Sequence, residues 1–226
     1  MKLWLLPGMH GTTEMFEPLL AALPSRFDVA PLGYPRDVAL GYDALLERLV
    51  QPVEPFAIVA ESFSGPLAIR FAAKRPEGLR ALVLVSSFAR CPVAAPRFAA
   101  PLLVPRWFRS PPPPFVIRAL MLGAEASDDE VEAVRSRLAC VAPEVLAHRI
   151  REILRVDVLD AFGGLELPML YLHGSRDRLV GARVPRELAE RNRALRLETL
   201  DAPHLLLQRC PDEAAARIAD FVSRSS

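Results

Sequence analysis

The strongest constraint on the fold lies in residues 56–74, where a buried strand meets a helix with almost no loop between them. Residues 56–60 (FAIVA) form a short continuous apolar run, which is typical of a strand buried on both faces of a parallel sheet. From Phe63 onward the residues favour a helix. The turn must therefore lie at residues 61–63, and so tight a turn strains its central residue and projects that side chain outward. That residue is Ser62.

The residues around Ser62 resemble the G-x-S-x-G nucleophile elbow of the α/β-hydrolase family. Ala60 and Ser64 stand at the two usual glycine positions, and both are small, as the crowded backbone of such a turn requires. The resemblance implies that Ser62 is a nucleophile. Two alternatives remain at this point: Ser62 could cap a core helix, or Ser64 could be the nucleophile. We favour Ser62 because Ser64 would fall inside the helix, two residues before the bulky Pro66.

Composition places the chain among globular domains and gives no sign of bulk nucleic-acid binding or disorder. Of its 226 residues, 51% are hydrophobic, and the formal net charge is +1. Three widely spaced cysteines indicate neither a disulfide framework nor a zinc site, which favours a reducing, cytoplasmic location. The apolar run at the start is interrupted at Pro7 and Gly8, too early for a signal-peptide core or a membrane span. We therefore expect one α/β domain with an insertion and no membrane association.

Buried strands alternate with helices over both ends of the chain. Strands are predicted at 2–6, 27–32, 56–60, 79–86, 168–172 and 195–200, and helices at 14–23, 42–50, 63–74, 185–192 and 211–222. This alternation is typical of a parallel sheet with helices on both faces. Because open parallel sheets place their sites at the carboxyl ends of the strands, the residues just after each strand are candidates for function.

The alternation stops between residues 88 and 164, where no convincing strand is found. Helices are predicted there at 115–122, 128–140 and 144–156. Ser127 and Glu130 form a capping box for the second of them. The segment resembles the helical cap inserted after the sixth strand in many α/β-hydrolases. We predict a core of residues 1–87 and 165–226 and a helical, Pro/Arg-rich cap of residues 88–164.

Two polar residues that follow late strands complete a catalytic set with Ser62. A serine hydroxyl needs a base within hydrogen-bond reach and a carboxylate that orients the base. His204 follows the last predicted strand, and Asp177 comes a few residues after the strand at 168–172. The chain order Ser62, Asp177, His204 is that of the α/β-hydrolase triad. The resemblance therefore implies a serine nucleophile, an aspartate that orients the base, and a histidine base.

Other residues could take the roles of base and acid. The rival histidines are His10, His148 and His173, and the rival acids are Asp157, Asp160 and Asp201. His148, Asp157 and Asp160 belong to the predicted cap. Asp201 is too near His204 to face it easily across a strand end. Glu61, beside Ser62, is frequent at this position in the family and needs no catalytic role.

The loop after the first strand is the candidate for the rest of the site. In the family this loop carries His-Gly-x, in which x donates a backbone N–H to the oxyanion hole. The match here is Pro7-Gly8-Met9, with proline in place of the histidine. The N–H groups of Met9 and of Phe63, which follows the nucleophile, are then the two oxyanion donors. A shifted register would assign Thr12 in place of Met9.

The predicted cap carries two groups of residues that bear on the substrate. Apolar residues that could line an acyl pocket are Trp107, Phe108, Phe115, Leu120 and Met121, although packing onto the sheet would also explain them. A stretch without Asp or Glu contains Arg90, Arg97, Arg106, Arg109 and Arg118. Such a basic field attracts anionic partners. It could dock an acyl carrier or an anionic substrate, or simply keep a proline-rich segment soluble.

The resemblance implies an α/β-hydrolase fold with a mostly parallel twisted sheet of about six strands, helices on both faces and a helical cap insertion. It implies acyl transfer to water through an acyl-enzyme on Ser62. A small apolar, proline-rich cap resembles carboxylesterases of short- to medium-chain acyl esters, including the pimeloyl-carrier methyl ester esterase type. No metal or organic cofactor is implied. Because the chain starts at what is usually the third strand of the family, we expect an exposed sheet edge that a second copy could cover.

The fold leaves the scissile bond open. The same triad serves acyl-thioesterases, carrier-linked ester hydrolases, lactonases and carbon–carbon hydrolases, and some relatives are non-catalytic binding proteins. An intact set of Ser62, Asp177 and His204 disfavours the last of these.

Overall fold

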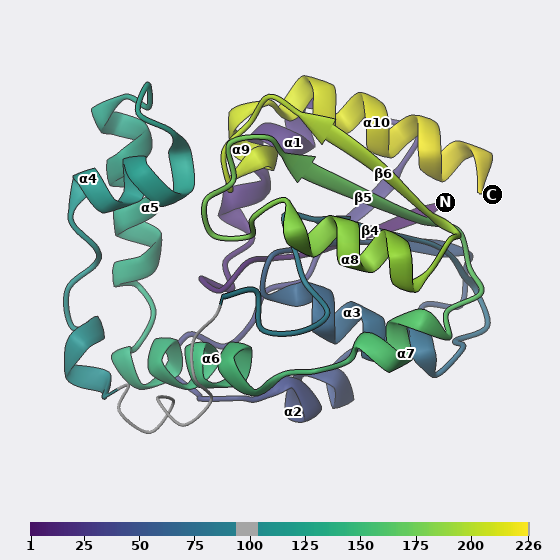
Figure 1. Cartoon of the computed structure of the whole chain (residues 1–226), viewed down its shortest axis with the longest axis horizontal. Helices are drawn as coiled ribbons and strands as arrows, with labels where there is room; N and C mark the ends of the chain where they lie inside the picture. The colour runs from purple at the N-terminus through teal and green to yellow at the C-terminus, as the bar shows by residue number, and fades with distance from the viewer. Residues whose placement is uncertain (94–103, 226) are drawn as a thin grey trace.

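One parallel sheet organises the residues that the structure describes, which are 1–93 and 104–225 of a computed structural model (Figure 1). Its strands are β1 (Lys2–Leu6), β2 (Asp28–Pro31), β3 (Phe56–Glu61), β4 (Leu79–Val85), β5 (Met169–Gly174) and β6 (Leu195–Leu200). The six strands lie in the order β2-β1-β3-β4-β5-β6. Every pairing between neighbours is parallel. The predicted fold class is thus confirmed.

Helices cover both faces of this sheet. One face packs against α2 (Tyr42–Glu47), α3 (Ser64–Ala73), α7 (Leu159–Gly163) and α8 (Arg183–Arg191). The other packs against η1 (Glu14–Phe16), α1 (Glu17–Ala22), α9 (Leu206–Arg209) and α10 (Pro211–Arg224). Figure 1 shows α10 and α1 on one side of the strands and α2, α3 and α7 on the other.

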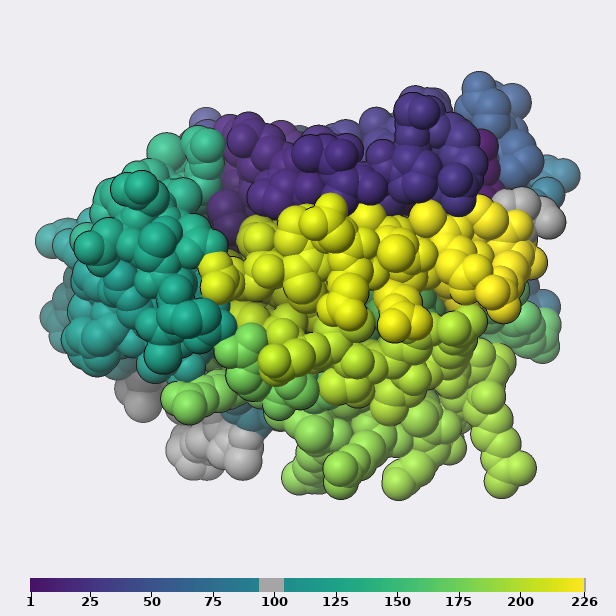
Figure 2. All heavy atoms as spheres, turned by 90° about the horizontal axis from the view of Figure 1, so that it is seen from above, coloured from purple at the N-terminus to yellow at the C-terminus, as the bar shows by residue number. Residues whose placement is uncertain are grey.

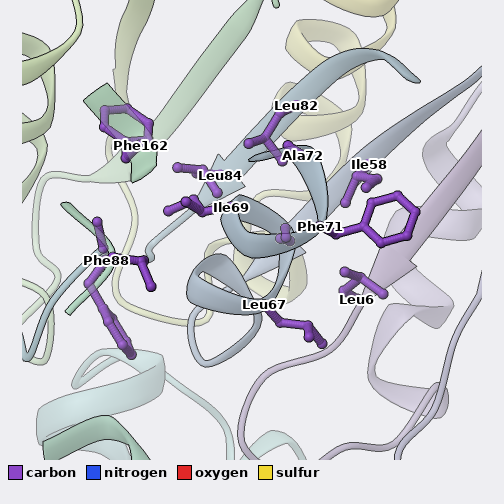
Figure 3. Close-up of a cluster of buried hydrophobic side chains, with 14 of the residues drawn as sticks. Leu6, Ile58, Leu67, Ile69, Phe71, Ala72, Leu82, Leu84, Phe88 and Phe162 are labelled. Atoms are coloured by element: carbon purple, nitrogen blue, oxygen red, sulfur yellow. The ribbon is translucent and has the colours of Figure 1, made fainter. Parts of the chain in front are cut away.

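Strand β3 shows why the central strands are apolar at every position. Ile58 belongs to the hydrophobic core on the α3 side, whereas Ala57 and Val59 belong to the core on the α10 side. Successive side chains of a strand point to opposite faces, so a strand covered on both faces must be apolar throughout. Figure 3 shows the first of these cores, in which Leu67 of α3 belongs to the same buried cluster as Ile58 of β3 and Leu84 of β4.

Helix ends and short helices differ most from the predictions. The helix predicted at 42–50 ends at Glu47, and the one at 115–122 is split into α4 (Pro114–Ile117) and a π-helical turn, η4 (Arg118–Leu122). Helices α7 and α9, of five and four residues, were not predicted because a 3.6-residue period cannot register over so short a span. Within residues 1–93 and 104–225, no helix is long and apolar enough to cross a bilayer.

The helices at one end of the molecule in Figure 1 belong to the segment between β4 and β5, here called the insert (residues 86–168). Its described part contains η3 (Pro105–Phe108), α4, η4, α5 (Asp128–Ala139), α6 (Pro143–Arg155) and α7. Buried residues of α4, α5 and α6 share a small core with Met15 and Leu205 from outside the insert. Figure 2 shows the insert abutting the C-terminal part of the chain. The insert thus packs both on itself and on the carboxyl edge of the sheet.

The predicted capping box at the start of α5 is confirmed. The Ser127 hydroxyl accepts from the Glu130 N–H at 3.2 Å, and the Glu130 carboxylate accepts from the Ser127 N–H at 2.8 Å. These bonds satisfy two backbone donors that the first helical turn would otherwise leave unpaired. They fix where α5 begins and therefore where its apolar face meets the small core of the insert.

Candidate active site

Ser62 lies in a strained turn between β3 and α3. Its φ of 48° is in the left-handed region, which costs a non-glycine residue about 1–3 kcal/mol. Both backbone groups of Ser62 are held: its N–H donates to Val85 O at 2.9 Å, and its carbonyl accepts from the Ser87 hydroxyl at 2.6 Å. A side chain at Gly65 would meet the same hydroxyl at 1.8 Å, so this position requires glycine. Phe63 rather than Ser62 is the N-cap of α3.

The structure brings Ser62, His204 and Asp177 together in one hydrogen-bonded chain. His204 Nε2 lies 3.0 Å from Ser62 Oγ, and His204 Nδ1 lies 2.9 Å from Asp177 Oδ2. A carboxylate can only accept, so Nδ1 carries the hydrogen and Nε2 is left to accept from the serine hydroxyl. The histidine and the aspartate are both buried. The arrangement can therefore remove a proton from Ser62 and hold the resulting imidazolium.

Asp177 is held in its charged form by three donors. Its Oδ1 accepts from the N–H groups of Leu179 and Val180, each at 2.9 Å. Burial acts to raise the pKa of Asp177, but the hydrogen bond from His204 and the two backbone bonds outweigh it and leave the pKa below its usual value. The negative charge that stabilises an imidazolium is thus present at neutral pH.

The rival residues have other partners. The Ser64 hydroxyl is fully buried, donates to Pro7 O and lies 2.5 Å from the Tyr34 hydroxyl. Asp201 pairs with Arg176, Asp160 pairs with Arg191, and an Asp157 oxygen accepts from Leu159 N–H. Among the described residues, His204 is the histidine that bonds Ser62. His148 is on α6 and His173 on β5, and burial lowers the pKa of His173.

The backbone of residues 7–9 has nearly all its polar groups bonded. Pro7 O accepts from Ser64, Gly8 O from Gly11 N–H at 3.0 Å, and Met9 O from Arg149 at 2.7 Å. Gly8 N–H donates to Glu61 Oε2 at 3.3 Å. No described residue accepts from the N–H of Met9 or of Phe63. By contrast, the Thr12 N–H is already bonded to His10 Nδ1 at 3.1 Å, which favours Met9 over Thr12 as an oxyanion donor.

A pocket of about 250 Å³ opens at Ser62 and His204. Its other lining residues are almost all apolar, and several come from the insert, including Met121, Leu138, Ile150, Ile153 and Leu154. No group of three or more His, Cys, Asp or Glu side chains in the described part of the chain could hold a metal ion. The pocket is suited to an apolar chain whose reacting carbonyl lies at the serine.

The structure separates the five residues predicted to line an acyl pocket. Met121 lines it. Phe108 packs against the small core of the insert. Trp107, Phe115 and Leu120 are 57%, 71% and 36% exposed and are not among the residues that line the pocket at Ser62.

The five arginines predicted to form a basic field also differ. Arg90 pairs with Glu187, and Arg118 pairs with Asp128 at 2.5 Å. Arg106 and Arg109 are exposed, and neither pairs with another described residue. Arg97 lies outside the described residues. Arg106 belongs to η3 and Arg109 directly follows it, and η3 packs against the pocket-lining helix α6.

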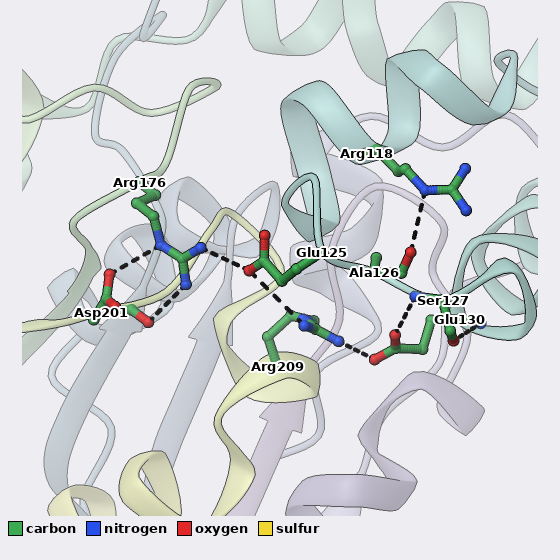
Figure 4. A network of polar contacts seen from close by, with 8 residues as sticks. All are labelled: Arg118, Glu125, Ala126, Ser127, Glu130, Arg176, Asp201 and Arg209. Carbon is green, nitrogen blue, oxygen red and sulfur yellow. Dashed lines mark hydrogen bonds and ion pairs between the residues drawn. The ribbon is translucent and has the colours of Figure 1, made fainter.

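An ion-pair network joins the insert to the loops that carry Asp177 and His204 (Figure 4). Arg176 lies 2.9 Å from Asp201 and 2.6 Å from Glu125 of the insert. Arg209 of α9 pairs with Glu130 of α5 and lies 3.9 Å from Glu125. Because most of these side chains are partly exposed, water can replace lost partners, and each pair contributes little stability.

Sequence reasoning missed the buried polar residues that support the site. Glu61 is fully buried and bonds Gly8, and Arg149 is 1% exposed and bonds Met9. A signal for Arg149 does exist. It lies one helical turn from Val145 and Leu146 on the buried face of α6, where a lone cation needs polar partners.

Comparison with known proteins places this geometry in a family. A sequence model of the alpha/beta hydrolase family matches residues 5–218. A pimeloyl-[acyl-carrier protein] methyl ester esterase from Neisseria meningitidis is 26% identical over 241 aligned positions, which cover 98% of this chain and 93% of that protein. The resemblance to that type, which the sequence predicts, is thus confirmed.

Solved structures show the same fold. An esterase from Thermogutta terrifontis superposes with a TM-score of 0.84 at 18% identity, covering 100% of this chain and 90% of the other. An enol-lactonase from Burkholderia xenovorans superposes with a TM-score of 0.80 at 19% identity, covering 98% and 91%. With its family match, its parallel sheet and its serine at a strained strand-to-helix turn, the chain belongs to the alpha/beta hydrolase family.

Proposed function

We propose that this chain is a serine carboxylic ester hydrolase that forms an acyl-enzyme on Ser62. The observation that carries the proposal is the hydrogen-bonded chain from Ser62 through His204 to Asp177, with separations of 3.0 and 2.9 Å. A serine hydroxyl is a weak nucleophile on its own, and an adjacent base with an oriented imidazole activates it. The esterase names of the curated relatives support the same chemistry.

The mechanism has two acyl-transfer steps. His204 Nε2 accepts the Ser62 proton as Oγ attacks the substrate carbonyl, and Asp177 holds the imidazolium through Nδ1. The N–H groups of Met9 and Phe63 donate to the oxyanion. His204 then gives its proton to the leaving alcohol. In the second step it takes a proton from a water molecule that attacks the acyl carbonyl, and it returns that proton to Ser62 Oγ as the bond between Oγ and the acyl group breaks and the acid leaves.

The pocket favours esters of short- to medium-chain acyl groups. It is apolar on most sides, has a volume of about 250 Å³, and is lined in part by residues of the insert. Binding of an apolar chain there removes apolar surface from water, which contributes about 25 cal/mol per Å². Long fatty acyl chains would extend beyond this space.

A carrier-linked ester is the second candidate substrate. The named relatives act on a pimeloyl-[acyl-carrier protein] methyl ester. The exposed Arg106 and Arg109, beside the pocket-lining helix α6, could hold an acidic carrier at that end of the molecule. Arg90 and Arg118 already have acidic partners and are weaker candidates.

The test combines labelling with a substrate series. A fluorophosphonate should modify Ser62 in the wild type, and Ser62→Ala should lose both labelling and about 10⁴-fold or more in kcat. Rates on p-nitrophenyl esters from acetate to palmitate should peak at short to medium chains, with acyl thioesters and a carrier-linked methyl ester run alongside. Labelling of Ser64 instead, or full turnover by Ser62→Ala, would refute the proposal. Charge reversal of Arg106 and Arg109 should slow the carrier-linked ester but not the p-nitrophenyl esters.

A further inference from the structure

Three consecutive peptide groups, from Pro7 to His10, determine the conformation around Met9. Each of them is hydrogen-bonded to another part of the chain. The Pro7–Gly8 peptide is held on both sides, by Ser64 at its carbonyl and by Glu61 at its N–H. The Gly8–Met9 peptide is held at its carbonyl by Gly11 N–H at 3.0 Å. Because a trans peptide directs its N–H opposite to its carbonyl, that bond points the Met9 N–H the other way.

The third peptide is held from the insert. Arg149 of α6 donates from Nη1 to Met9 O at 2.7 Å and from Nη2 to Pro35 O at 2.7 Å. With the peptide planes on both sides of its Cα fixed, the two backbone dihedrals of Met9 are fixed as well. Arg149 therefore holds the Met9–His10 peptide, although the two bonded residues, Met9 and Arg149, are 140 positions apart in the chain.

Arg149 occupies an environment that is costly for a cation. It is 1% exposed, and among the described residues no carboxylate forms an ion pair with it. Burial lowers the pKa of Arg149 to about 10. Two carbonyls and the face of the Tyr34 ring, 5.7 Å away, are its compensation. Burial of a cation without a carboxylate partner costs free energy, so we infer that the contacts of Arg149 have a role in the site.

Tyr34 connects Arg149 to the other end of the loop. Its ring lies under the guanidinium, and its hydroxyl is 2.5 Å from Ser64 Oγ, which in turn donates to Pro7 O. Residues 7 and 9 are thus held by one continuous set of buried side chains. Ile150 and Ile153, which follow Arg149 by one and four positions on α6, line the pocket. One helix therefore contacts both the acyl pocket and the loop that carries the proposed oxyanion donor.

We propose that Arg149 is a positioning residue for the oxyanion hole: by bonding Met9 O it holds the Met9–His10 peptide, and together with the Gly11 bond to Gly8 O it keeps Met9 in the conformation in which its N–H points at the developing oxyanion. The inference rests on the proposed serine hydrolase function and adds to it. Arg149 does not line the pocket, so it acts through Met9 and does not touch the substrate. It makes the insert part of the catalytic geometry as well as a wall of the pocket.

Two variants and a matched control test this role. Arg149→Met keeps the length and packing of the stem but removes both donors, and Arg149→Lys keeps the charge and can restore one bond. Arg155→Gln, an exposed arginine on the same helix, is the control. Active sites are counted by fluorophosphonate titration, so that kcat refers to folded enzyme. The affinity of a trifluoromethyl ketone, which forms a tetrahedral adduct in the hole, is compared with that of a non-reactive ketone of the same chain length.

Loss of one oxyanion donor costs on the order of 10²–10³ in kcat, so we expect a misplaced donor in Arg149→Met to cost about 10- to 100-fold. KM should change by less than about twofold, and Arg149→Lys should recover part of the loss. The trifluoromethyl ketone should weaken by the same factor as kcat/KM, and the non-reactive ketone should not. Arg155→Gln should match the wild type.

A purely structural role would lower the melting temperature without changing kcat per titrated site. That result in Arg149→Met, with unchanged affinity for the trifluoromethyl ketone, would overturn the inference. If Arg149→Met does not fold, Arg149→Lys decides alone: an unchanged kcat and inhibitor affinity would count against the role, and a loss confined to kcat would support it. Absence of Ser62 labelling in the wild type would instead sink the proposed function itself, so the two failures are distinguishable.

Discussion

The insert meets the sheet at two junctions that are built from different kinds of contact. At the buried junction, Arg149 is 1% exposed and donates to Met9 O and Pro35 O. At the exposed junction, Arg176 and Glu125 pair at 2.6 Å while each side chain stays 46% exposed. A buried group that loses its partner pays the full cost of desolvation, whereas water replaces the partner of an exposed one. We infer that the buried junction determines the geometry of the site and that the exposed junction contributes little.

The largest expected effect is that of Asp177→Asn. Asp177 and Asp201 show the same contrast between a buried and an exposed contact. Asp177 is buried and accepts from His204, whereas Asp201 has an 84% exposed side chain and pairs with Arg176. Asp177→Asn should lower kcat by about 10⁴-fold because the amide no longer enforces the tautomer that leaves Nε2 free to accept. Asp201→Asn should stay within about twofold of the wild type. Steady-state kinetics on one p-nitrophenyl ester check both, and equal losses in the two variants would contradict the contrast.

The lowered pKa of Asp177 also predicts that the stability of the fold depends on pH. The pKa of Asp177 in the folded chain lies below its ordinary value of 3.8, so the unfolded chain binds this proton more readily. The contribution of the charged carboxylate is therefore complete above about pH 4 and is lost as the pH falls through the lowered pKa. The gap in unfolding free energy between the wild type and Asp177→Asn should therefore narrow as the pH falls below about 4. Urea unfolding at each pH measures it, and a gap that widens on acidification would contradict the sign.

A smaller effect is expected from a glycine at the buried junction. Gly11 has a φ of +72°, and a methyl group there would lie 2.7 Å from Arg149 Nη1 and 3.1 Å from Tyr34 Cβ. Gly11→Ala should therefore cost about 1–3 kcal/mol in backbone strain and displace the guanidinium from Met9. We expect kcat to fall about tenfold as the oxyanion donor loses its orientation. Thermal unfolding and kcat per titrated site are the measurements.

Gly181→Ala is the matched control, because a methyl group at Gly181 would have nothing within 4 Å and its φ is not in the left-handed region. Its stability and kcat should equal those of the wild type. If Gly11→Ala loses stability but keeps its full kcat, then the buried junction supports the fold without orienting the oxyanion donor.

How much of the site can be predicted from the sequence depends on how far apart in the chain the interacting residues lie. The sequence predicts Ser62, Asp177 and His204 because each comes soon after a strand, and parallel strands bring their carboxyl ends to one edge. Arg149 bonds a backbone carbonyl 140 residues away, and a carbonyl leaves no mark in the sequence. The approximate number of strands, their parallel arrangement and the residues that follow them were thus predictable, but the contacts that orient the loops were not.

The residues that line the pocket were less predictable for a related reason. Trp107 and Phe115 are as apolar as Met121, yet only Met121 of these three lines the pocket among the described residues. Apolarity indicates that a side chain favours burial, but which surface it faces depends on how the insert packs onto the sheet. That packing depends on contacts between segments far apart in sequence, as between Leu205 and the small core of the insert.

The smallest effect is expected at the exposed junction, and it tests the comparison from the other side. Arg176→Gln and Glu125→Gln should each lower the unfolding free energy by less than about 1 kcal/mol and leave kcat within about twofold of the wild type. The double variant measures their coupling, which should shrink in about 1 M NaCl because salt screens exposed charges. Arg75 and Glu166, an ion pair at 3.2 Å with 73% and 78% exposed side chains, provide a matched cycle away from the site. A tenfold loss of kcat in Arg176→Gln alone would show that the exposed junction orients the Asp177 loop, and the contrast between the two junctions would then fail.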